Sequence, residues 1–445
     1  MVESIEIGKK SSLSWILVAT IFSALIFGGA NNAVLSSFYS GVISILVTIG
    51  LAFYALKPWQ EIDWTLKWAL LFLVLFLGYI ILTLIPNPIL PAHPAWEMIS
   101  DEAGIATISF YRTIEGLAAF IGFISAFFAA RMFTQSRTGR DAFFKAIIWL
   151  SIPYCLYALS LYGAQGGRLM VNYTSANSAA TSFYLLFFLS MNNIFVLLYK
   201  GSSKNMRFPI FARLLLDAPV SLVALILSLV CLLVTASRTG IALTCVGCVA
   251  IFFLNAVFMQ KGKIKTTVSK IAVMSVAAVI IFVGFGSNYV LRRFDESLAQ
   301  HAQTREVLVE THWNLFLQRP VFGHGMNSFH DLNQLAATPE NWASIVGVGS
   351  THNIFVNALE EVGVIGFSLG CLLGLCLIAG VVGHLARSKL GSTDSYWALT
   401  TCVAICICLL HGLVDFGLQV PAIAYLVMAL LGAAGARNSK ELSRR

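Results

Sequence analysis

The chain alternates between long apolar runs and shorter polar connections, and the length of the runs predicts helices that cross a membrane. About twelve runs approach the roughly 20 residues that a helix needs to span a bilayer. They cover residues 14–31, 33–56, 66–86, 112–131, 144–163, 177–199, 217–236, 239–259, 271–289, 353–386, 396–415 and 419–436. Backbone amides in lipid must be paired internally, and these runs are too long and continuous for barrel strands. We therefore predict an all-α, polytopic integral membrane protein.

The composition agrees with this fold class. Apolar residues make up 58% of the chain and charged residues 11%, whereas a soluble domain usually carries about 25% charged residues. The first run follows Lys9 and Lys10 but lacks a small-residue cleavage site, so we expect it to be retained as the first span. All nine cysteines fall within apolar runs. We expect them to be small core residues, with no disulfide or redox pair.

One long polar stretch interrupts the apolar pattern, and it defines the predicted organisation of the chain. We expect nine transmembrane helices in residues 1–290, an external loop with amphipathic helices in 291–351, three more spans in 352–436 and a short tail in 437–445. The loop holds several arginines and no lysine, and His352 follows directly after it.

Basic residues divide unevenly between alternate connections, which predicts the orientation of the chain. All lysines fall in one set, and this set is therefore expected to face the cytoplasm together with both termini. The other set contains only arginines, namely Arg112, Arg168, Arg238, Arg292, Arg293, Arg305 and Arg319. The net charge of +8 lies mostly on the cytoplasmic side, so it does not indicate a nucleic-acid partner.

The external arginines indicate a phosphate ligand, because a guanidinium presents paired donors that match a phosphate whereas an ammonium is a point charge. Arg238 lies in a tight turn between two spans, at the edge of the bilayer, where an unpartnered charge is costly. Arg168 lies at the mouth between two helices, and Arg292 and Arg293 begin the long loop. These four are candidates to bind an anionic group.

Within the long loop, the apolar spacing from Val307 to Leu317 predicts a short amphipathic helix that ends at Pro320, with Arg305 near its start. A further helix is expected from His352, and its polar stripe should face the interior of the bundle. The stripe consists of Asn353, Asn357, Glu360 and Glu361. Asp415, which follows His411 near the end of the eleventh span, is expected to support the same cavity.

These residues suit a group transfer at the external membrane surface. A neutral imidazole at His352 can take a proton from a hydroxyl at ambient pH. Two arginines can hold a pyrophosphate and stabilise the charge that grows on it as it leaves. No phosphate-binding glycine loop and no external cluster with metal-ligand spacing occurs in the sequence. We therefore expect a reaction without a metal or another cofactor, in which a glycan moves from a lipid diphosphate to an acceptor hydroxyl.

The segment from His352 to Gly366 resembles the His-Asn/Ser segment with spaced glycines of the bacterial O-antigen ligase and O-antigen polymerase superfamily. Ser237-Arg238-Thr239-Gly240 resembles that family's Ser-Arg turn. The run from Arg305 through Trp313 to Gly323-His324-Gly325 resembles its Arg, Trp, Pro and Gly-x-Gly loop, and His411 to Asp415 resembles its late His/Asp element. The resemblance covers most of the chain and is strongest from Ser237 to Asp415.

The resemblance implies a GT-C-like, inverting, metal-independent glycosyltransferase of the bacterial inner membrane. It implies that undecaprenyl-diphosphate-linked polysaccharide is taken at the periplasmic face, that Arg238 and Arg305 bind the diphosphate, and that His352 is the base. Asp415 would support the site. Asn353 belongs to the motif, whereas Arg168, Arg292 and Arg293 are secondary candidates from their position alone.

The acceptor stays open between several classes. A ligase transfers the chain to lipid A-core, and a polymerase transfers it to another lipid-linked repeat; the ligase is preferred. A protein O-oligosaccharyltransferase usually has an extended C-terminal region, and this chain stops shortly after its last predicted span. A secondary transporter would also have many helices, but the sequence shows no internal repeat and its polar residues cluster at one rim.

Overall fold

The computed structural model describes residues 2–54, 63–98, 104–164, 167–201, 215–216, 218–255, 257 and 297–436. Within these residues the regular secondary structure is helical, without strands. The predicted span at 271–289 and the candidates Arg292 and Arg293 lie outside them.

Eleven helices of the described part coincide with eleven of the twelve predicted spans, which confirms the all-α polytopic class. Seven are long and apolar enough to cross a membrane: α2 (Ala33–Tyr54), α3 (Trp64–Thr83), α4 (Phe110–Phe133), α5 (Arg137–Tyr162), α6 (Ala176–Gly201), α14 (Ile354–Arg387) and α15 (Thr393–His411). Four others contain shorter apolar segments: α1 (Val2–Ile26), α8 (Pro219–Val234), α9 (Arg238–Leu254) and α16 (Pro421–Gly435). The total number of spans stays a prediction.

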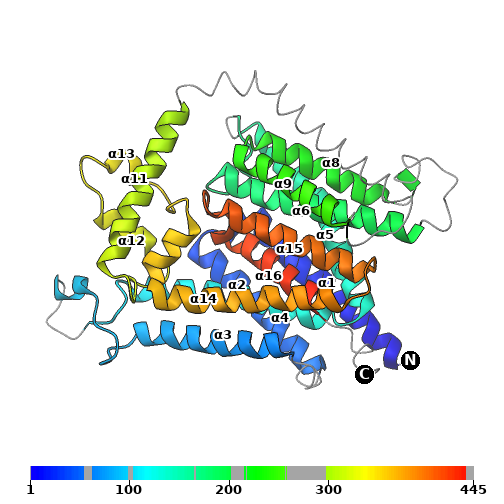
Figure 1. Ribbon diagram of the computed structural model, residues 1–445, viewed down its shortest axis with the longest axis horizontal. Helices are drawn as coiled ribbons and strands as arrows, with labels where there is room; N and C mark the ends of the chain where they lie inside the picture. Colours follow the sequence, from blue (N-terminus) through cyan, green and yellow to red (C-terminus); the bar gives the residue numbers. More distant parts are fainter. Residues whose placement is uncertain are drawn as a thin grey trace.

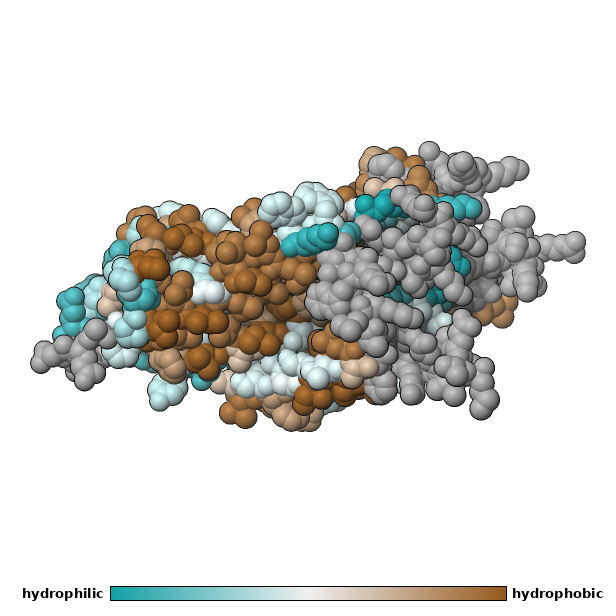
Figure 2. Space-filling view, turned by 90° about the horizontal axis from the view of Figure 1, so that it is seen from below, coloured by the Kyte–Doolittle hydropathy of each residue, from teal (hydrophilic) through white to brown (hydrophobic). Residues whose placement is uncertain are grey.

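The apolar helices run side by side (Figure 1), and α6 and α16 are among the most buried of them. The helix α16 packs against α4 and α14, and almost all of its side chains are buried. The helix α3 packs against α14 at the edge, and its outward side chains, such as Trp68 and Val74, are exposed and apolar. Figure 2 shows a broad apolar surface on this side of the molecule. Such a surface suits contact with lipid.

The two ends of the bundle differ in character. At one end, the Ser14 hydroxyl donates to the Gly139 carbonyl (3.0 Å), and the Arg140 guanidinium donates to the Ala436 carbonyl (2.9 Å). The N-terminal part of α1, the α4–α5 turn and the end of α16 therefore meet at this end. The other end carries α11 (Ser297–Gln318), α12 (Phe329–Leu335) and α13 (Trp342–Ile345), and α11 lies across the bundle helices (Figure 1). We call this second end the loop end.

The helix α11 is longer than the sequence pattern suggested. It begins at Ser297, so Arg305 lies in its third turn and not near its start as predicted. The prediction relied on apolar spacing, and the first turns of α11 contain few apolar residues. The expectation for the cysteines was also partly wrong, because Cys371 and Cys406 are exposed on the outer surfaces of α14 and α15.

The helix α14 is broken at Gly363, which has a φ of 61°. Backbone groups of residues 320–325, which contain Gly323-His324-Gly325, form hydrogen bonds with the residues on either side of this break. The amides of His324 and Gly325 donate to the carbonyls of Glu360 and Glu361 (3.0 and 2.8 Å), and the amide of Val364 donates to the Pro320 carbonyl (2.8 Å). Backbone groups released by a helix break must find new partners inside an apolar environment. This loop therefore supplies the backbone partners that the break in α14 requires.

Glycine is required on both sides of this contact. A Cβ at Gly323 would lie 2.4 Å from the amide nitrogen of Gly363, and a Cβ at Gly363 would lie 2.4 Å from the Val321 carbonyl oxygen. Both glycines also have a positive φ, which other residues rarely adopt. We call residues 354–362, before the break, the α14 tip.

The polar stripe of the α14 tip does not face the interior of the bundle, and that prediction was wrong. The Glu360 carboxylate contacts His312 of α11, and the Glu361 carboxylate accepts hydrogen bonds from the Asn357 side chain and the Asn327 amide (both 2.9 Å). The prediction assumed one straight helix entering the membrane. The break places these acids at the loop end, against α11 and the loop that follows it.

Two histidines join the loop after α3 to the Gly-x-Gly loop. The Ala95 amide donates to Nδ1 of His93 (3.1 Å), so Nε2 of His93 carries a proton and donates to Nδ1 of His324 (2.9 Å). Nε2 of His324 in turn donates to the Leu315 carbonyl (2.9 Å). This chain of donors requires both rings to be neutral. The pKa of His93 is lowered to about 3, mainly by burial and further by the neighbouring His324 and Arg319.

We expect the contact between these two loops to weaken in acid. An unfolded histidine takes up a proton near pH 6.5 whereas folded His93 resists it, so the unfolded state binds more protons between about pH 6.5 and pH 3. The free energy of unfolding therefore falls as the pH falls through this range, by up to about 1.4 kcal/mol per pH unit for one such group. The hydrogen-exchange protection factors of residues 91–98, which are corrected for the slower intrinsic exchange in acid, should fall accordingly in the purified protein. His93→Gln should flatten this pH dependence, and an equal slope in both proteins would contradict the explanation.

Candidate functional site

Four parts of the chain meet at the loop end to form the candidate site. They are the start of α14, the turn after α15, the start of α6 and the turn between α8 and α9. The Ile354 amide donates to the Gly412 carbonyl (2.9 Å), which joins the first two. A Cβ at Gly417 would lie 2.4 Å from the Thr181 hydroxyl, so the turn after α15 packs closely on α6. A Cβ at Gly240 would lie 2.8 Å from the Ala180 Cβ, so α9 also begins against α6.

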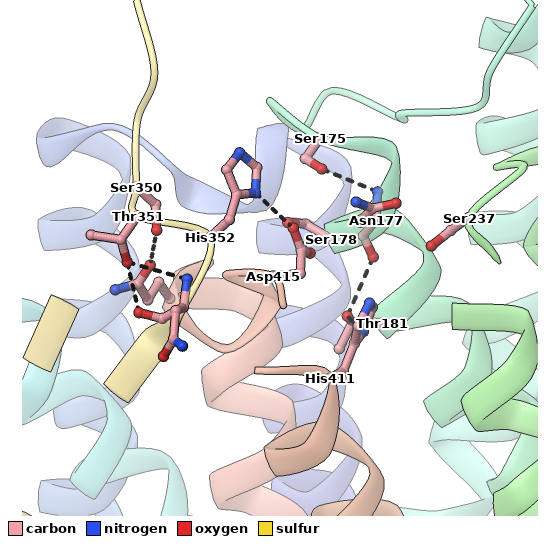
Figure 3. A network of polar contacts seen from close by, with 12 residues as sticks. Ser175, Asn177, Ser178, Thr181, Ser237, Ser350, Thr351, His352, His411 and Asp415 are labelled. Carbon is pink, nitrogen blue, oxygen red and sulfur yellow. Dashed lines mark hydrogen bonds and ion pairs between the residues drawn. The ribbon is translucent and has the colours of Figure 1, made fainter. Parts of the chain in front are cut away.

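His352 and Asp415 form an acid–imidazole pair at this meeting point (Figure 3). Nδ1 of His352 lies 3.3 Å from Oδ1 of Asp415; the carboxylate is 1% exposed and the imidazole 22% exposed. The Ser178 hydroxyl donates to the other carboxylate oxygen (3.4 Å), and the Phe416 ring packs edge-on to the imidazole (5.1 Å between centroids). A carboxylate at Nδ1 favours the tautomer that carries its proton there, so Nε2 keeps a lone pair. In Figure 3 that nitrogen points away from Asp415.

The backbone around His352 fixes the direction of this ring. His352 has a φ of 56°, which is unusual for a residue other than glycine. The next residue, Asn353, is the N-cap of α14, and its side-chain oxygen accepts from the amides of Phe355 and Val356 (3.0 and 3.2 Å). The Thr351 hydroxyl donates to the Asn353 carbonyl (2.7 Å). The asparagine of the motif therefore caps the helix and holds His352 just before it.

Three of the candidate arginines lie near this pair. Arg168 donates to the Thr235 carbonyl (3.1 Å) and to the Asn177 side chain (3.4 Å). Partial burial lowers the pKa of Arg168, the charges of Arg238 and Arg305 lower it further, and the charge of Asp415 acts in the opposite direction. Arg238, Arg305 and Asp415 therefore each lie close enough to Arg168 for their charges to act on it. We call the three arginines the guanidinium cluster.

Arg238 is presented by an N-cap. The Ser237 hydroxyl accepts from the Gly240 amide (3.2 Å), so Arg238 is the first residue of α9, and its side chain is exposed. The same tetrapeptide, Ser-Arg-Thr-Gly, occurs at residues 136–139, where Ser136 caps α5 in the same way at the opposite end of the bundle (3.0 Å). The serine and glycine of this motif are therefore capping residues, and only the location of the arginine distinguishes the two copies.

His411 lies beneath the pair, at the end of α15. Its Nδ1 is 3.1 Å from the Thr181 hydroxyl, and the Asp415 amide donates to its carbonyl (3.0 Å). Arg305 is close enough for its charge to act on this histidine. His411 is almost fully buried and contributes to the floor of the site.

The polar face of α6 was not anticipated from the sequence. Asn177, Ser178 and Thr181 contact Arg168, Asp415 and His411 respectively. They carry no motif, and each is a common residue at the start of an apolar helix. The available signal was that they recur at helical spacing on one face, which the apolar run that follows obscured.

Two other external arginines have structural partners outside the site. Arg319 donates to the carbonyls of Pro91 and Ala92 (3.0 and 3.2 Å), so it fastens the loop after α3. Arg112 lies 3.3 Å from Glu115 and 3.6 Å from Asp331. Arg292 and Arg293 lie outside the described residues. In the part of the chain that is described, no group of three or more His, Cys, Asp or Glu side chains could hold a metal ion.

The bundle and this site together define a polytopic membrane protein with an acid–imidazole pair and clustered guanidinium groups at one end. Residues 223–371 match the sequence model of the family described as O-antigen ligase, and this match supports the O-antigen ligase and polymerase superfamily that the motifs predicted. No match was found among curated proteins. The matched region contains Arg238, Arg305 and His352, whereas Arg168 and Asp415 lie outside it.

Proposed function

We propose that the protein is an inverting glycosyltransferase of the bacterial inner membrane. It moves a polysaccharide from undecaprenyl diphosphate to an acceptor hydroxyl at the periplasmic face, with lipid A-core as the acceptor. The observation that carries this proposal is the guanidinium cluster beside the His352–Asp415 pair, in a chain of the O-antigen ligase and polymerase superfamily. The loop end would then be periplasmic and both termini cytoplasmic, in agreement with the lysine distribution.

The guanidinium cluster supplies what a diphosphate needs. The positive charges of Arg238 and Arg305 both act on Arg168, and like charges held near one another without a bound anion repel. A diphosphate relieves this repulsion and accepts paired hydrogen bonds from the guanidinium groups. The three arginines come from separate elements, so they can surround the ligand from different sides. We assign Arg238 and Arg305 to the diphosphate and Arg168 to a supporting contact.

The proposed reaction is a single displacement. Nε2 of His352 takes the proton of the acceptor hydroxyl while that oxygen forms a bond to the anomeric carbon. The bond from this carbon to the diphosphate oxygen breaks, and its electron pair leaves with the diphosphate. Asp415 stabilises the imidazolium that forms, and the arginines stabilise the charge that develops on the leaving group. The configuration at the anomeric carbon is inverted.

The second candidate is an O-antigen or exopolysaccharide polymerase, in which another lipid-linked repeat replaces lipid A-core as the acceptor. The family match supports both equally. The other two classes have less support. The family match disfavours a secondary transporter, and nothing in the site favours a protein acceptor.

Reconstitution tests the proposal directly. The purified protein is placed in liposomes with an undecaprenyl-diphosphate-linked glycan and either lipid A-core or a second portion of the lipid-linked glycan. A glycosylated lipid A-core is expected, whereas chain elongation alone would establish the polymerase. Absence of any new glycosidic bond with either acceptor would contradict the enzyme.

Asp415, the partner of His352, should affect kcat and leave binding of the donor nearly unchanged. Asp415→Asn keeps the shape of the side chain but can present an N–H to Nδ1, which favours the tautomer with the proton on Nε2. That tautomer cannot accept a proton from the acceptor. We expect kcat to fall by about 100-fold or more, with the KM for the donor changed little. Steady-state kinetics in liposomes measure this, and an unchanged kcat would remove Asp415 from the mechanism.

Metal chelation should leave the activity unchanged. The proposed charge stabilisation comes from arginines, so no divalent ion has a role in the displacement. Transfer should therefore proceed at the same rate with and without EDTA in the reconstituted assay. A loss that added Mg²⁺ or Mn²⁺ restores would show that a metal ion participates.

A further inference from the structure

A buried acid–base pair joins the helix that carries Arg305 to the segment that carries His352. Nδ1 of His312, on α11, lies 2.8 and 2.9 Å from the two carboxylate oxygens of Glu360, on the α14 tip. Both side chains are fully buried, with 0% exposure. The pair lies outside the site described above and plays no part in the proposed displacement.

The neighbours of His312 define the proton balance of this pair. The Asn333 side-chain nitrogen donates to the Ile345 carbonyl (2.7 Å), so its oxygen accepts from Nε2 of His312 (3.2 Å). One further proton must then lie between Nδ1 and the carboxylate, on either group. The pair is neutral as a unit in both cases. The Phe329 ring stacks on the imidazole (4.5 Å between centroids) and helps to shield it from water.

Stability alone does not explain such a pair. Removing two ionisable groups from water costs about as much free energy as their attraction returns, and apolar side chains of similar size are often equally stable. The best-supported role of a buried polar pair is to fix one register between two elements. A register is needed here, because the break at Gly363 separates the α14 tip from the rest of α14.

The positions of the pair match this role. His312 follows Arg305 by seven residues, or two helical turns, so both lie on the same face of α11. Glu360 follows His352 by eight residues and lies on the short helix that His352 precedes. The helices α11 and α14 pack against each other at this point. The contact therefore lies about 10 Å along the helix from each functional residue.

We propose that His312 and Glu360 are positioning residues that fix the guanidinium of Arg305 relative to the imidazole of His352. This inference rests on the proposed function. The pair holds the leaving-group side and the base side of the site in one arrangement, so that the diphosphate and the acceptor hydroxyl meet at the correct separation. Neither residue touches substrate.

A double-mutant cycle with Arg305 tests the inference. The double variant His312→Leu/Glu360→Met replaces the pair with apolar side chains and leaves no buried charge, so the protein should keep its thermal stability. We expect its kcat to fall by about 30- to 100-fold, because misplacement by about 1 Å can cost 100-fold. In an Arg305→Ala background the same replacement should reduce kcat by less than about 3-fold, since the side chain that it misplaces is absent. An equal fold reduction of kcat in the wild-type and Arg305→Ala backgrounds would overturn the inference.

Two further variants sharpen the result. Glu360→Gln can donate to Nδ1 of a neutral His312 and so retains the contact; its kcat should stay within about 3-fold of the wild type. Asp394→Asn weakens the partly buried Arg140–Asp394 ion pair (2.7 Å) at the opposite end of the bundle. Any effect of this control should be the same in both Arg305 backgrounds. If Glu360→Gln were as impaired as the apolar double variant, the hydrogen bond would not be the positioning element.

The cycle also separates this inference from the proposed function. Arg305→Ala by itself tests the diphosphate role. Full activity of that variant would contradict the proposed function. If Arg305→Ala is impaired but the double replacement lowers kcat by the same factor with and without Arg305, only the positioning role of the pair is contradicted.

Discussion

Replacing His352 with alanine is expected to abolish glycan transfer while leaving the protein folded in the membrane. His352 is the one imidazole of the site whose ring is partly exposed, and Asp415 orients it so that Nε2 can accept a proton. A positioned general base typically contributes about 100- to 10,000-fold to the rate, and we expect a loss of kcat in this range. The KM for the lipid-linked donor should change little, because we assign the diphosphate contacts to arginines.

A second histidine of the loop end provides the control. His330 on α12 is exposed, and its ring contacts the Gln334 side chain (3.0 Å). His330→Ala should retain full turnover and the thermal stability of the wild type. If His352→Ala retained turnover comparable to that of His330→Ala in the reconstituted assay, another group would have to act as the base.

The membrane fold could be predicted because the lipid constrains it strongly. Apolar runs of sufficient length must be helices, and eleven of the predicted spans coincide with described helices. The break in α14 could not be read from this pattern, because residues 354–387 are apolar enough to suggest one continuous helix. Its cause is a contact between Gly363 and Gly323, forty residues apart, and sequence periodicity carries no information on such pairing.

The candidate site, too, could be predicted only in part from the sequence. Arg238 could be singled out because an arginine at the membrane edge is costly unless it has a partner. Arg305 and His352 could be singled out from the polar loop and its resemblance to the family's motifs. Their mutual approach could not be derived, since it depends on how α6, α9 and α11 pack. The glutamates of the α14 tip were expected in a cavity of the bundle, and they instead contact α11 and its following loop. Residue spacing predicts that polar side chains share one face of a helix, but the elements packed around the helix determine which way that face points.

The two copies of Ser-Arg-Thr-Gly allow a matched test of the phosphate role. Arg238 and Arg137 are both the first residue of an apolar helix, each behind a serine N-cap, at opposite ends of the bundle. Lysine keeps the charge of arginine but loses the planar pair of donors. Hydrogen bonds to charged groups contribute about 1.5–3 kcal/mol each, so losing one fork contact corresponds to about 10- to 100-fold in transition-state stabilisation.

We therefore expect Arg238→Lys to lower kcat/KM for the lipid-linked donor by about 10- to 100-fold, nearly as much as Arg238→Ala. Arg137→Lys should leave transfer unchanged, because that residue lies in the α4–α5 turn, at the end of the bundle opposite the loop end. The comparison controls for helix capping and for insertion, since both substitutions occupy the same position of the same tetrapeptide. Full activity of Arg238→Lys would show that a point charge suffices, and the bidentate contact to the diphosphate would then be wrong.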